Sequence, residues 1–268
     1  MTHWSMASYT HGHHESVLRS HSVRDISNSA EYLRPHLTAD TRLLDVGAGP
    51  GSITVDFARV VRQVTATEID EAALSLSRQL AATTGAANID FSIEDVHALS
   101  FADDSFDVVH AHQVLQHVAD PVQALREMRR VTVPGGVVAA RDADYAGFLW
   151  FPSSPGLDRW LDLYRRAARD NGGEPDAGRR LLSWARAAGF DEVTATASSW
   201  CYATPEDRAW WGGMWADRIL ESALTRQLLD SGMATMADLQ SISEAWRQWA
   251  DDGDGWFLVP HGEIIARA

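Results

Sequence analysis

The chain has 268 residues, a formal net charge of −14 and no lysine, because arginine supplies all 23 of its basic residues. This length accommodates one large α/β domain with an insertion, or two small domains. Nucleic acid attracts basic surfaces, so the acidic balance argues against such a partner. Without lysine, Schiff-base chemistry and a P-loop lysine are excluded. The single cysteine, Cys201, excludes an internal disulfide and a cysteine-based zinc site.

The chain carries no targeting or membrane signal that we can identify. Its first residues, Met1-Thr2-His3-Trp4-Ser5, lack the basic start and apolar stretch of a signal peptide. No segment is an uncharged apolar run of about 20 residues, the length that crosses a bilayer. We therefore expect a cytoplasmic protein without a membrane partner.

Strands and helices alternate through residues 42–142. Apolar runs predict five strands, at residues 42–46, 64–68, 89–93, 106–111 and 137–141. The segments between them carry helical apolar spacing, with start signals at Asp70 and at Asp120-Pro121. This alternation predicts an α/β fold with a doubly wound, Rossmann-like and mostly parallel sheet. Ligands bind such sheets at the carboxyl ends of the strands.

The pattern changes after Asp144. We expect a helical insertion, then a helix at 178–188 and a strand at 192–197, then helices that start near Thr204 and Thr235. Residues 256–259 and 263–266 form the last strand, or strand pair, of a seven-stranded sheet. The predicted parts are an N-terminal helical lid (1–40), a Rossmann-like core (41–145, 177–199 and 253–268) and a helical cap over the acceptor site (146–176 and 200–252).

Most of the eleven tryptophans follow residue 146. Trp210, Trp211, Trp215, Trp246 and Trp249 recur at helical spacing. They either pack the interior of the cap or form an aromatic wall beside an apolar or planar ligand.

A glycine-rich turn follows the first strand, and an acid, Glu68, ends the second. The glycines allow a tight turn and a close approach to a ligand, and the acid can accept hydrogen bonds from ribose hydroxyls. A dinucleotide fingerprint needs Gly-x-Gly-x-x-Gly, but Ser52 stands at the third glycine position and the extra glycine is Gly51. The turn therefore predicts a nucleoside ligand other than NAD; a turn without a ligand is the alternative.

Three further segments accompany this turn: Ser92–Val96, Phe106–His117 and Arg130–Gly136. Together with the turn they resemble the class I S-adenosylmethionine-dependent methyltransferases, in the ubiquinone/menaquinone-methyltransferase-like branch. The resemblance covers about residues 9–145. It is specific for fold and cofactor and does not specify the methyl acceptor.

The resemblance implies S-adenosylmethionine as the cofactor and assigns residues to it. Glu68 would hold the ribose and Asp95 the adenine amino group, unless Asp95 only caps a turn. The backbone of Val96 would bind a ring nitrogen of the adenine. The implied cofactor-binding residues are Tyr9, Arg24, Asp45, Gly47, Ala48, Gly49, Gly51, Glu68, Ile69, Asp95, Val96, His112 and Gln113.

The N-terminal segment from Tyr9 to His14 resembles a lid that folds over the cofactor in many such enzymes. Arg24, shortly after it, is suited to a bidentate grip on the methionine carboxylate. Two alternatives stay open: a metal site formed by the three histidines in this segment, and a solvated tail. Because no acid or cysteine is suitably spaced beside these histidines, we predict no metal.

Three residues are predicted on the acceptor side of the site. His117 follows the fourth strand and could act as a general base, or hold a structural hydrogen bond. Asp144 and Tyr145 follow the fifth strand and either contact the substrate or form a turn. The sequence thus predicts methyl transfer to a small, apolar or aromatic molecule, at oxygen or carbon, by SN2 displacement. The alternatives are a non-methylating enzyme that binds this cofactor and a non-catalytic protein of the same fold.

Overall fold

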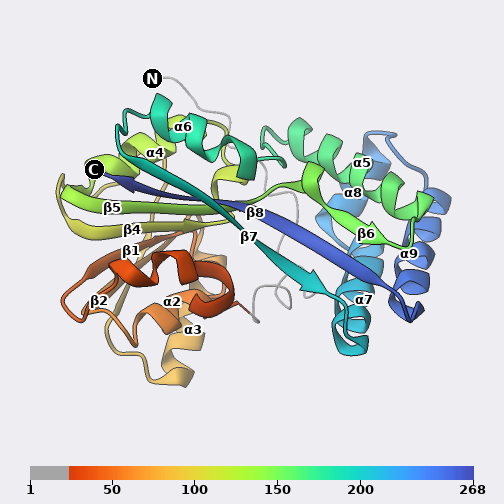
Figure 1. Cartoon of the computed structure of the whole chain (residues 1–268), viewed down its shortest axis with the longest axis horizontal. Helices are drawn as coiled ribbons and strands as arrows, with labels where there is room; N and C mark the ends of the chain where they lie inside the picture. Colours follow the sequence, from red (N-terminus) through yellow and green to blue (C-terminus); the bar gives the residue numbers. More distant parts are fainter. Residues whose placement is uncertain (1–23) are drawn as a thin grey trace.

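The computed structural model describes residues 24–268, and its strands form one eight-stranded sheet (Figure 1). The strand order is β3-β2-β1-β4-β5-β8-β6, and β7 pairs with the other edge of β8. Strands β1 to β5 are parallel, whereas β8 runs antiparallel to β5, β6 and β7. The strands are β1 Arg42–Val46, β2 Gln63–Glu68, β3 Ile89–Ile93, β4 Phe106–His112, β5 Thr132–Ala143, β6 Leu149–Phe151, β7 Val193–Tyr202 and β8 Trp256–Arg267.

Helices cover both faces of the parallel part of the sheet. One face packs with α4 and α6, and the other packs with η1, η2, α2 and α3. The helical elements of the core are η1 Ile26–Ala30, η2 Glu31–His36, α2 Ser52–Phe57, α3 Glu71–Thr84, η3 Leu115–His117, α4 Pro121–Arg130, η4 Tyr145–Gly147, η5 Gly178–Arg180 and α6 Leu181–Ala187. Those of the cap are α5 Pro155–Asp170, α7 Pro205–Glu221, α8 Ala223–Asp230 and α9 Met236–Asp251.

The helix starts confirm the predicted caps. The carboxylates of Asp70 and Asp120 accept hydrogen bonds from the backbone N–H groups of Ala73 and Gln123, each 2.9 Å away. Thr204 and Thr235 form capping boxes at the starts of α7 and α9. Each cap satisfies amide groups that the first helical turn leaves without a partner.

The doubly wound fold is confirmed, and the sheet has one strand more than predicted. The extra strand is β6, which lies inside the segment expected to be wholly helical. Of the two alternatives for the last segment, the structure has the single strand, β8. Helix α8 was not predicted. Strand β5 begins at Thr132, ahead of the Pro134-Gly135-Gly136 turn, because a bulge in its pairing with β4 accommodates that turn.

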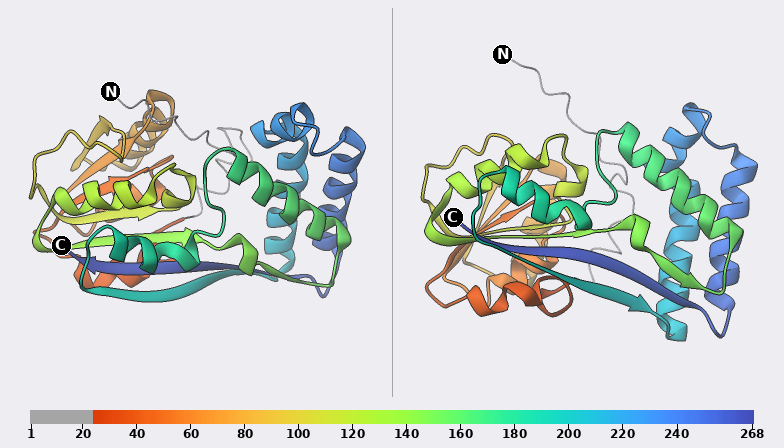
Figure 2. Two further views of the ribbon diagram at one scale, coloured as in Figure 1. Left: turned by 90° about the horizontal axis from the view of Figure 1, so that it is seen from above. Right: turned by 45° about the horizontal axis from the view of Figure 1, so that its top comes forward.

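Strand β8 connects the two halves of the molecule (Figure 2). One edge of β8 pairs with β5 and then with β6, and its other edge pairs with β7 along residues 193–202. Phe257 and Val259 of β8 belong to the apolar interior of the cap, whereas Ile264 and Ala266 belong to that of the core. The core and the cap therefore share two long strands and are not joined by a simple linker.

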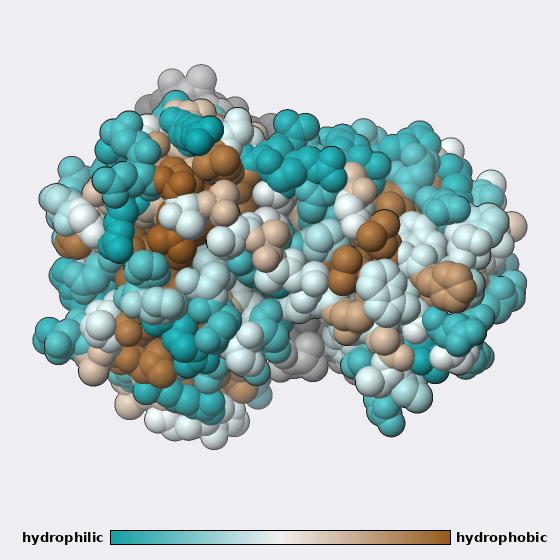
Figure 3. All heavy atoms as spheres, viewed as in Figure 1, coloured by the Kyte–Doolittle hydropathy of each residue, from teal (hydrophilic) through white to brown (hydrophobic). Residues whose placement is uncertain are grey.

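The tryptophans of the cap form its interior, as one of the two interpretations predicted. Trp160, Trp215 and Trp246 are each at most 1% exposed. Ring centroids lie 4.5 Å apart between Trp160 and Trp215 and 4.9 Å apart between Trp160 and Trp246, both edge to face, an arrangement that adds to the energy of burial. The outer face shown in Figure 3 is mostly hydrophilic, with smaller apolar areas on both halves.

The N-terminal region is helical where the structure describes it, as a π-helical turn, η1, followed by the 3-10 turn η2. Ile26, Ala30 and Leu33 are buried against the sheet face that carries Leu43 and Ala139. Tyr9 and the three histidines that follow it lie outside the described residues. Within residues 24–268, no helix combines the length and apolar character needed to cross a membrane.

Candidate functional site

The glycine turn after β1 depends on backbone conformations that favour glycine. Gly47, Gly49 and Gly51 have φ values of 66°, 58° and 86°. A Cβ atom on Gly47 would lie 2.5 Å from Cγ2 of Val114, closer than real contacts allow. Glycine at position 47 thus lets the turn pack closely against Val114 at the carboxyl end of β1, where sheets of this type bind ligands.

Glu68 lies directly beside this turn. Its carboxylate accepts hydrogen bonds from the backbone N–H of Gly49 at 2.6 Å and of Ile69 at 3.2 Å. Burial raises the pKa of Glu68, while these two amide contacts oppose that shift. The end of β2 therefore places a half-buried carboxyl group where a ligand bound at the glycine turn could contact it.

The next strand end supplies a second acid and an apolar surface. Asp95 is 44% exposed, and its carboxylate is 2.7 Å from Nδ1 of His97. The Nε2 atom of His97 accepts from the backbone N–H of Asp120, so we assign the ring proton to Nδ1, facing Asp95. Ile69 and Ile93 are 48% and 53% exposed at the ends of β2 and β3. A flat apolar group would find both an exposed apolar surface and a carboxylate acceptor here.

Asp45 lies beneath the turn, in the sheet interior. Its side chain accepts a hydrogen bond from Oγ1 of Thr54 at 2.6 Å, and its other oxygen is 2.9 Å from Nδ1 of His110. These contacts join β1 to α2 and β4 and so hold the turn in place. The structure shows that Asp45 supports the glycine turn through Thr54 and His110. Direct contact between Asp45 and the cofactor stays a prediction.

Arg24, His112 and Gln113 lie together near the end of β4. The Nη2 atom of Arg24 donates to Oε1 of Gln113 at 2.8 Å, and Nε2 of Gln113 is 3.0 Å from Nε2 of His261. Arginine only donates, so the amide oxygen faces Arg24 and Nε2 of His261 accepts from Gln113. Gln113 has a φ of 54°, in the left-handed region. In this structure Arg24 thus orients Gln113, and its grip on a methionine carboxylate stays a prediction.

A buried arginine, Arg141, follows on the neighbouring strand β5. It is 1% exposed, and its Nε donates to Glu263 of β8 at 3.2 Å and to Ser198 of β7 at 3.1 Å. Its guanidinium carbon lies 4.8 Å from the centre of the Trp200 ring. Burial lowers the pKa of Arg141, but the nearby Glu263 carboxylate favours its charged form. Three strands, β5, β7 and β8, therefore meet around one buried charge pair.

His117 lies on η3, where its imidazole is already engaged. Oε1 of Gln116 accepts from the backbone N–H of Ala143, which turns Nε2 of Gln116 toward Nε2 of His117 at 2.9 Å. His117 therefore accepts this hydrogen bond, and burial lowers its pKa to about 4. It is neutral at pH 7, as a base must be, but would have to release Gln116 before taking a proton. Its catalytic role stays a prediction.

Asp142 lies beside this group as a fully buried carboxyl. Its Oδ1 accepts from the backbone N–H of Gln116 at 3.0 Å, whereas Oδ2 has no hydrogen-bond partner among the described residues. Burial raises the pKa of Asp142 to about 7. The end of β5 therefore holds a carboxyl group that is partly protonated at neutral pH.

Asp144 and Tyr145 have contacts that favour structural roles over the predicted substrate contact. Both oxygens of Asp144 accept from the guanidinium of Arg179 at 2.6 Å, which fixes η5 to the end of β5. The ring of Tyr145 is buried 4.2 Å from that of Tyr164 in the cap interior, and burial raises its pKa. Their direct part in catalysis stays a prediction.

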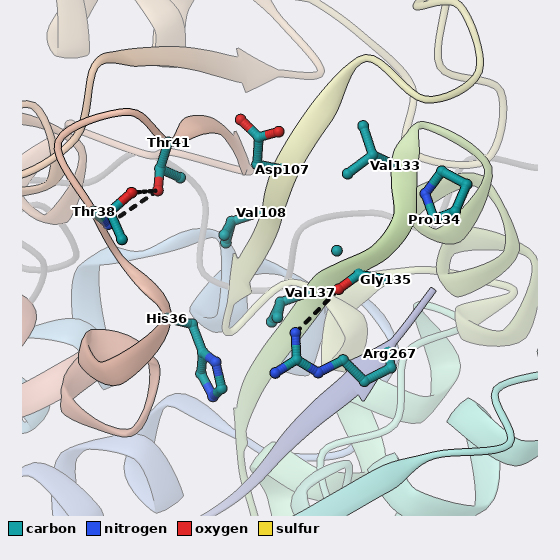
Figure 4. A pocket seen from close by; sticks show the side chains of 11 residues that line it. His36, Thr38, Thr41, Asp107, Val108, Val133, Pro134, Gly135, Val137 and Arg267 are labelled. Carbon is teal, nitrogen blue, oxygen red and sulfur yellow. Dashed lines mark hydrogen bonds between the residues drawn. The ribbon is translucent and has the colours of Figure 1, made fainter.

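A separate surface hollow lies at the opposite edge of the sheet (Figure 4). It is lined by residues at the amino ends of β4 and β5, such as Asp107 and Val133, and by Arg267 at the end of β8. Parallel sheets bind ligands at the other edge, so this hollow is not the candidate site.

Comparison with known proteins decides the family. A model of the methyltransferase domain matches residues 44–140, which include the glycine turn, Glu68 and Asp95. A protein of Schizosaccharomyces pombe named "uncharacterized methyltransferase" is 33% identical and covers 96% of this chain and 95% of its own length. A probable methyltransferase of Aspergillus luteorubrus is 30% identical, with 96% of both chains covered. The chain is an S-adenosylmethionine-dependent methyltransferase of class I.

Other matches agree with the branch and the fold of this methyltransferase. The ubiquinone/menaquinone biosynthesis C-methyltransferase of Hahella chejuensis is 33% identical over 48% of this chain and 51% of its own. A solved S-adenosylmethionine-dependent methyltransferase of Methanosarcina mazei has a TM-score of 0.55 at 16% identity, covering 90% and 98%. The cyclase SpnF has the same fold, with a TM-score of 0.53 at 21% identity, covering 96% and 88%.

The residues of the methyltransferase fit S-adenosylmethionine. The glycine turn, the carboxyl of Glu68 and the exposed surface of Ile69 and Ile93 match a methionine tail, a ribose and an adenine in that order along the strand ends. When bound, the cofactor supplies an activated methyl group on a sulfonium. The protein then has to align an acceptor with that methyl group and exclude water.

Several site residues were missed in the sequence. His110, Arg141, His261 and Glu263 were not selected, although all lie on the sheet face that carries His112. His110 and His112 alternate with apolar residues along β4, and this period of two places their side chains on one face. A similar alternation of His261 and Glu263 in the last strand was a signal that could have been used.

Proposed function

We propose that this methyltransferase transfers a methyl group to oxygen or carbon of a small, planar or apolar molecule. The main support for this proposal is that the polar side chains on β4, β5 and β8, next to the glycine turn, are buried. His112 is 7% exposed, Arg141 1% and His261 1%. Such an enclosed environment suits a small molecule better than a protein surface or a nucleic acid.

The chain's own residues account for binding and alignment. Gly47 and Glu68 position the methionine and ribose parts of the cofactor, and Trp200 offers an aromatic face beside His112, with ring centroids 5.9 Å apart. A planar acceptor on this face would lie close to the end of β4, next to the glycine turn. SN2 transfer gains most from such alignment, so a strong catalytic base is not required when the acceptor ionises easily.

The full-length likeness to two proteins named as methyltransferases supports methyl transfer. The fold by itself does not distinguish it from other chemistry, since the structurally similar SpnF is a cyclase. A non-methylating enzyme that binds the same cofactor is therefore the alternative that the test must address.

The experiment has two steps. Calorimetric titration with S-adenosylmethionine and S-adenosylhomocysteine, with NAD as a control, should show micromolar binding of the first two only. Incubation with methyl-labelled cofactor and a panel of phenols, quinones and aromatic carboxylic acids should then yield a labelled product. If the cofactor binds and no acceptor becomes labelled, but one acceptor is rearranged, the protein is instead a non-methylating enzyme that binds the same cofactor.

A further inference from the structure

Five polar residues form a continuous row on one buried face of the sheet. His110 and His112 of β4, Arg141 of β5, and His261 and Glu263 of β8 are each at most 7% exposed. We call them the polar row. Strand pairing places His112 opposite Arg141, and Arg141 opposite Glu263. The row therefore runs across neighbouring strands at the level of the glycine turn.

Arg141 is the positively charged member of the row, and its hydrogen bonds are incomplete. Its Nε is bonded to Glu263 and Ser198, but Nη1 and Nη2 have no hydrogen-bond partner among residues 24–268. Buried polar groups are almost always paired, and an unpaired charged donor is especially costly. A buried guanidinium that keeps both terminal nitrogens open is thus best explained by a ligand that supplies two acceptors.

Other open groups surround the same place. Both ring nitrogens of His112 and the hydroxyl of Tyr32 on η2 are buried without a partner among the described residues. Burial and the charges of Arg24 and Arg141 lower the pKa of His112, so its ring is neutral and offers one donor and one acceptor. Burial raises the pKa of Tyr32, which keeps its hydroxyl protonated.

Glu263 contacts Arg141 through Nε and not through the two terminal nitrogens. Besides Nε of Arg141, it accepts hydrogen bonds from the hydroxyls of Ser198 and of Thr196, the latter at 2.9 Å. It therefore balances the charge of Arg141 and leaves its terminal nitrogens available. The planar fork that remains matches the two oxygens of a carboxylate.

The distance from the glycine turn agrees with an acceptor site. Strand β4 lies between β1 and β5, so Arg141 is two strand spacings, or about 10 Å, from the start of the turn. This separation holds one aromatic ring between the cofactor and the guanidinium. Trp200 lies beside Arg141. The centre of its ring is 4.8 Å from the guanidinium carbon of Arg141 and 4.3 Å from the centre of the His261 ring.

We infer that Arg141 binds the carboxylate of a planar methyl acceptor, with His112 and Tyr32 as further hydrogen-bonding partners and Trp200 as a stacking surface. This inference rests on the proposed function, since it names the class of acceptor for the same site. The substrate class is a conjugated or aromatic carboxylic acid that also carries a phenol or enol group. The oxygen or carbon of that group attacks the methyl of the sulfonium, S-adenosylhomocysteine leaves, and the proton of the phenol or enol passes to water.

The test measures binding of benzoate, cinnamate and 2-naphthoate to the enzyme saturated with S-adenosylhomocysteine, each beside its neutral primary amide. The wild-type enzyme should bind at least one carboxylate tenfold or more tightly than the matching amide. Arg141→Lys keeps the charge but loses the fork, so it should remove most of this preference. Amide binding should change little.

A second variant protects the test against misfolding. Arg141→Gln leaves Glu263 buried without its counter-charge, so the double variant R141Q/E263Q removes both charges together. It should also lose the carboxylate preference, while Arg186→Gln, an exposed arginine on α6, should keep it. Equal affinity for acids and amides in the wild type, or an unchanged preference in both Arg141 variants, would overturn the inference.

Other results would contradict the proposed methyltransferase function itself. These are no binding of S-adenosylhomocysteine, or no methyl transfer to any acceptor. Normal cofactor binding with methyl transfer to neutral acceptors only would instead overturn the carboxylate assignment and leave the methyltransferase function intact.

Discussion

In the cap, aromatic rings fill the interior: Trp160, Trp215 and Trp246 are buried and pack edge to face or stacked against one another. In the Rossmann-like core, the interior at the strand ends holds the polar row instead. Among the described residues, buried atoms without a hydrogen-bond partner occur in both halves: the indole nitrogens of Trp160 and Trp246 in the cap, and the terminal nitrogens of Arg141 in the row. A buried ring still gains from its apolar surface when its N–H group is unpaired, whereas a buried charged donor without acceptors costs more stability. The comparison indicates that the cap supplies rigidity and the core supplies binding.

The largest expected effect is in the cap. Trp246→Ala removes a fully buried ring and should lower the free energy of unfolding by about 3–5 kcal/mol. Trp256→Ala, at a residue 36% exposed at the start of β8, should cost less than about 1 kcal/mol. Urea denaturation followed by near-ultraviolet circular dichroism measures both. Similar costs for the two variants would contradict an interior built on the buried rings.

At the end of β5, replacing the buried Asp142 should raise the free energy of unfolding and not lower it, and the gain should depend on pH. Burial raises the pKa of Asp142 to about 7, so the folded chain holds a proton there that the unfolded chain releases near pH 4. Wild-type stability from this residue therefore falls as pH rises from about 4 to about 7. Asp142→Asn keeps the acceptor for Gln116 and should gain a few kcal/mol over the wild type at about pH 8, and little at about pH 4.

His117→Gln is the matched control because its sign is reversed. Burial lowers the pKa of His117 to about 4, so the wild-type contribution rises with pH between about 4 and 6.5. The glutamine variant should gain stability mainly below about pH 6. Urea denaturation of both variants across this range checks the pair, and parallel pH profiles would show that neither group is buried in solution.

The third prediction concerns cofactor binding in the core. Glu68→Ala should weaken binding of S-adenosylhomocysteine by about 1–3 kcal/mol, because the ribose hydroxyls lose their acceptor. Glu71→Ala, an exposed acid at the start of α3, is the control and should leave affinity unchanged. Isothermal titration calorimetry gives both values. Unchanged affinity in the Glu68 variant would contradict the placement of the ribose.

The smallest effect should be the same in both halves. Asp70→Ala removes the N-cap of α3 in the core and Thr235→Ala that of α9 in the cap; each should cost about 1 kcal/mol of unfolding free energy. Asp70→Asn and Thr235→Ser retain an acceptor and should restore most of the loss. Thermal denaturation checks this, and very unequal costs would show that the two halves differ in their helix ends as well as in their interiors.

Much of the fold follows from local patterns in the sequence. The bounds of β1 and β3 agree with the prediction, and the N-caps at Asp70 and Thr235 lie where predicted. These features depend on periodicity and on capping chemistry within a few residues, so they are readable without the tertiary structure. Strand β6, three residues long, has no such pattern and forms because β8 extends past β5 and offers it an edge.

The candidate site divides in the same way. The glycine turn and Glu68 were predictable because their spacing along the chain is itself the signal. Arg141 was not, since an arginine in a strand carries no sign of whether it is buried, paired or open. Asp144 was predicted on the acceptor side from its place after β5, but its bidentate contact with Arg179 depends on how η5 packs there.

The sequence by itself determined the α/β class, the glycine turn and the acids at the ends of β2 and β3, because each depends on short-range spacing. Only the tertiary structure decided which side chains meet beyond the turn. Strand β8 inserts antiparallel between β5 and β7, which brings Glu263 and His261 beside Arg141 across more than a hundred residues of chain. That pairing is long-range, and burial of the resulting charge pair is a property of the packed sheet that no local pattern encodes.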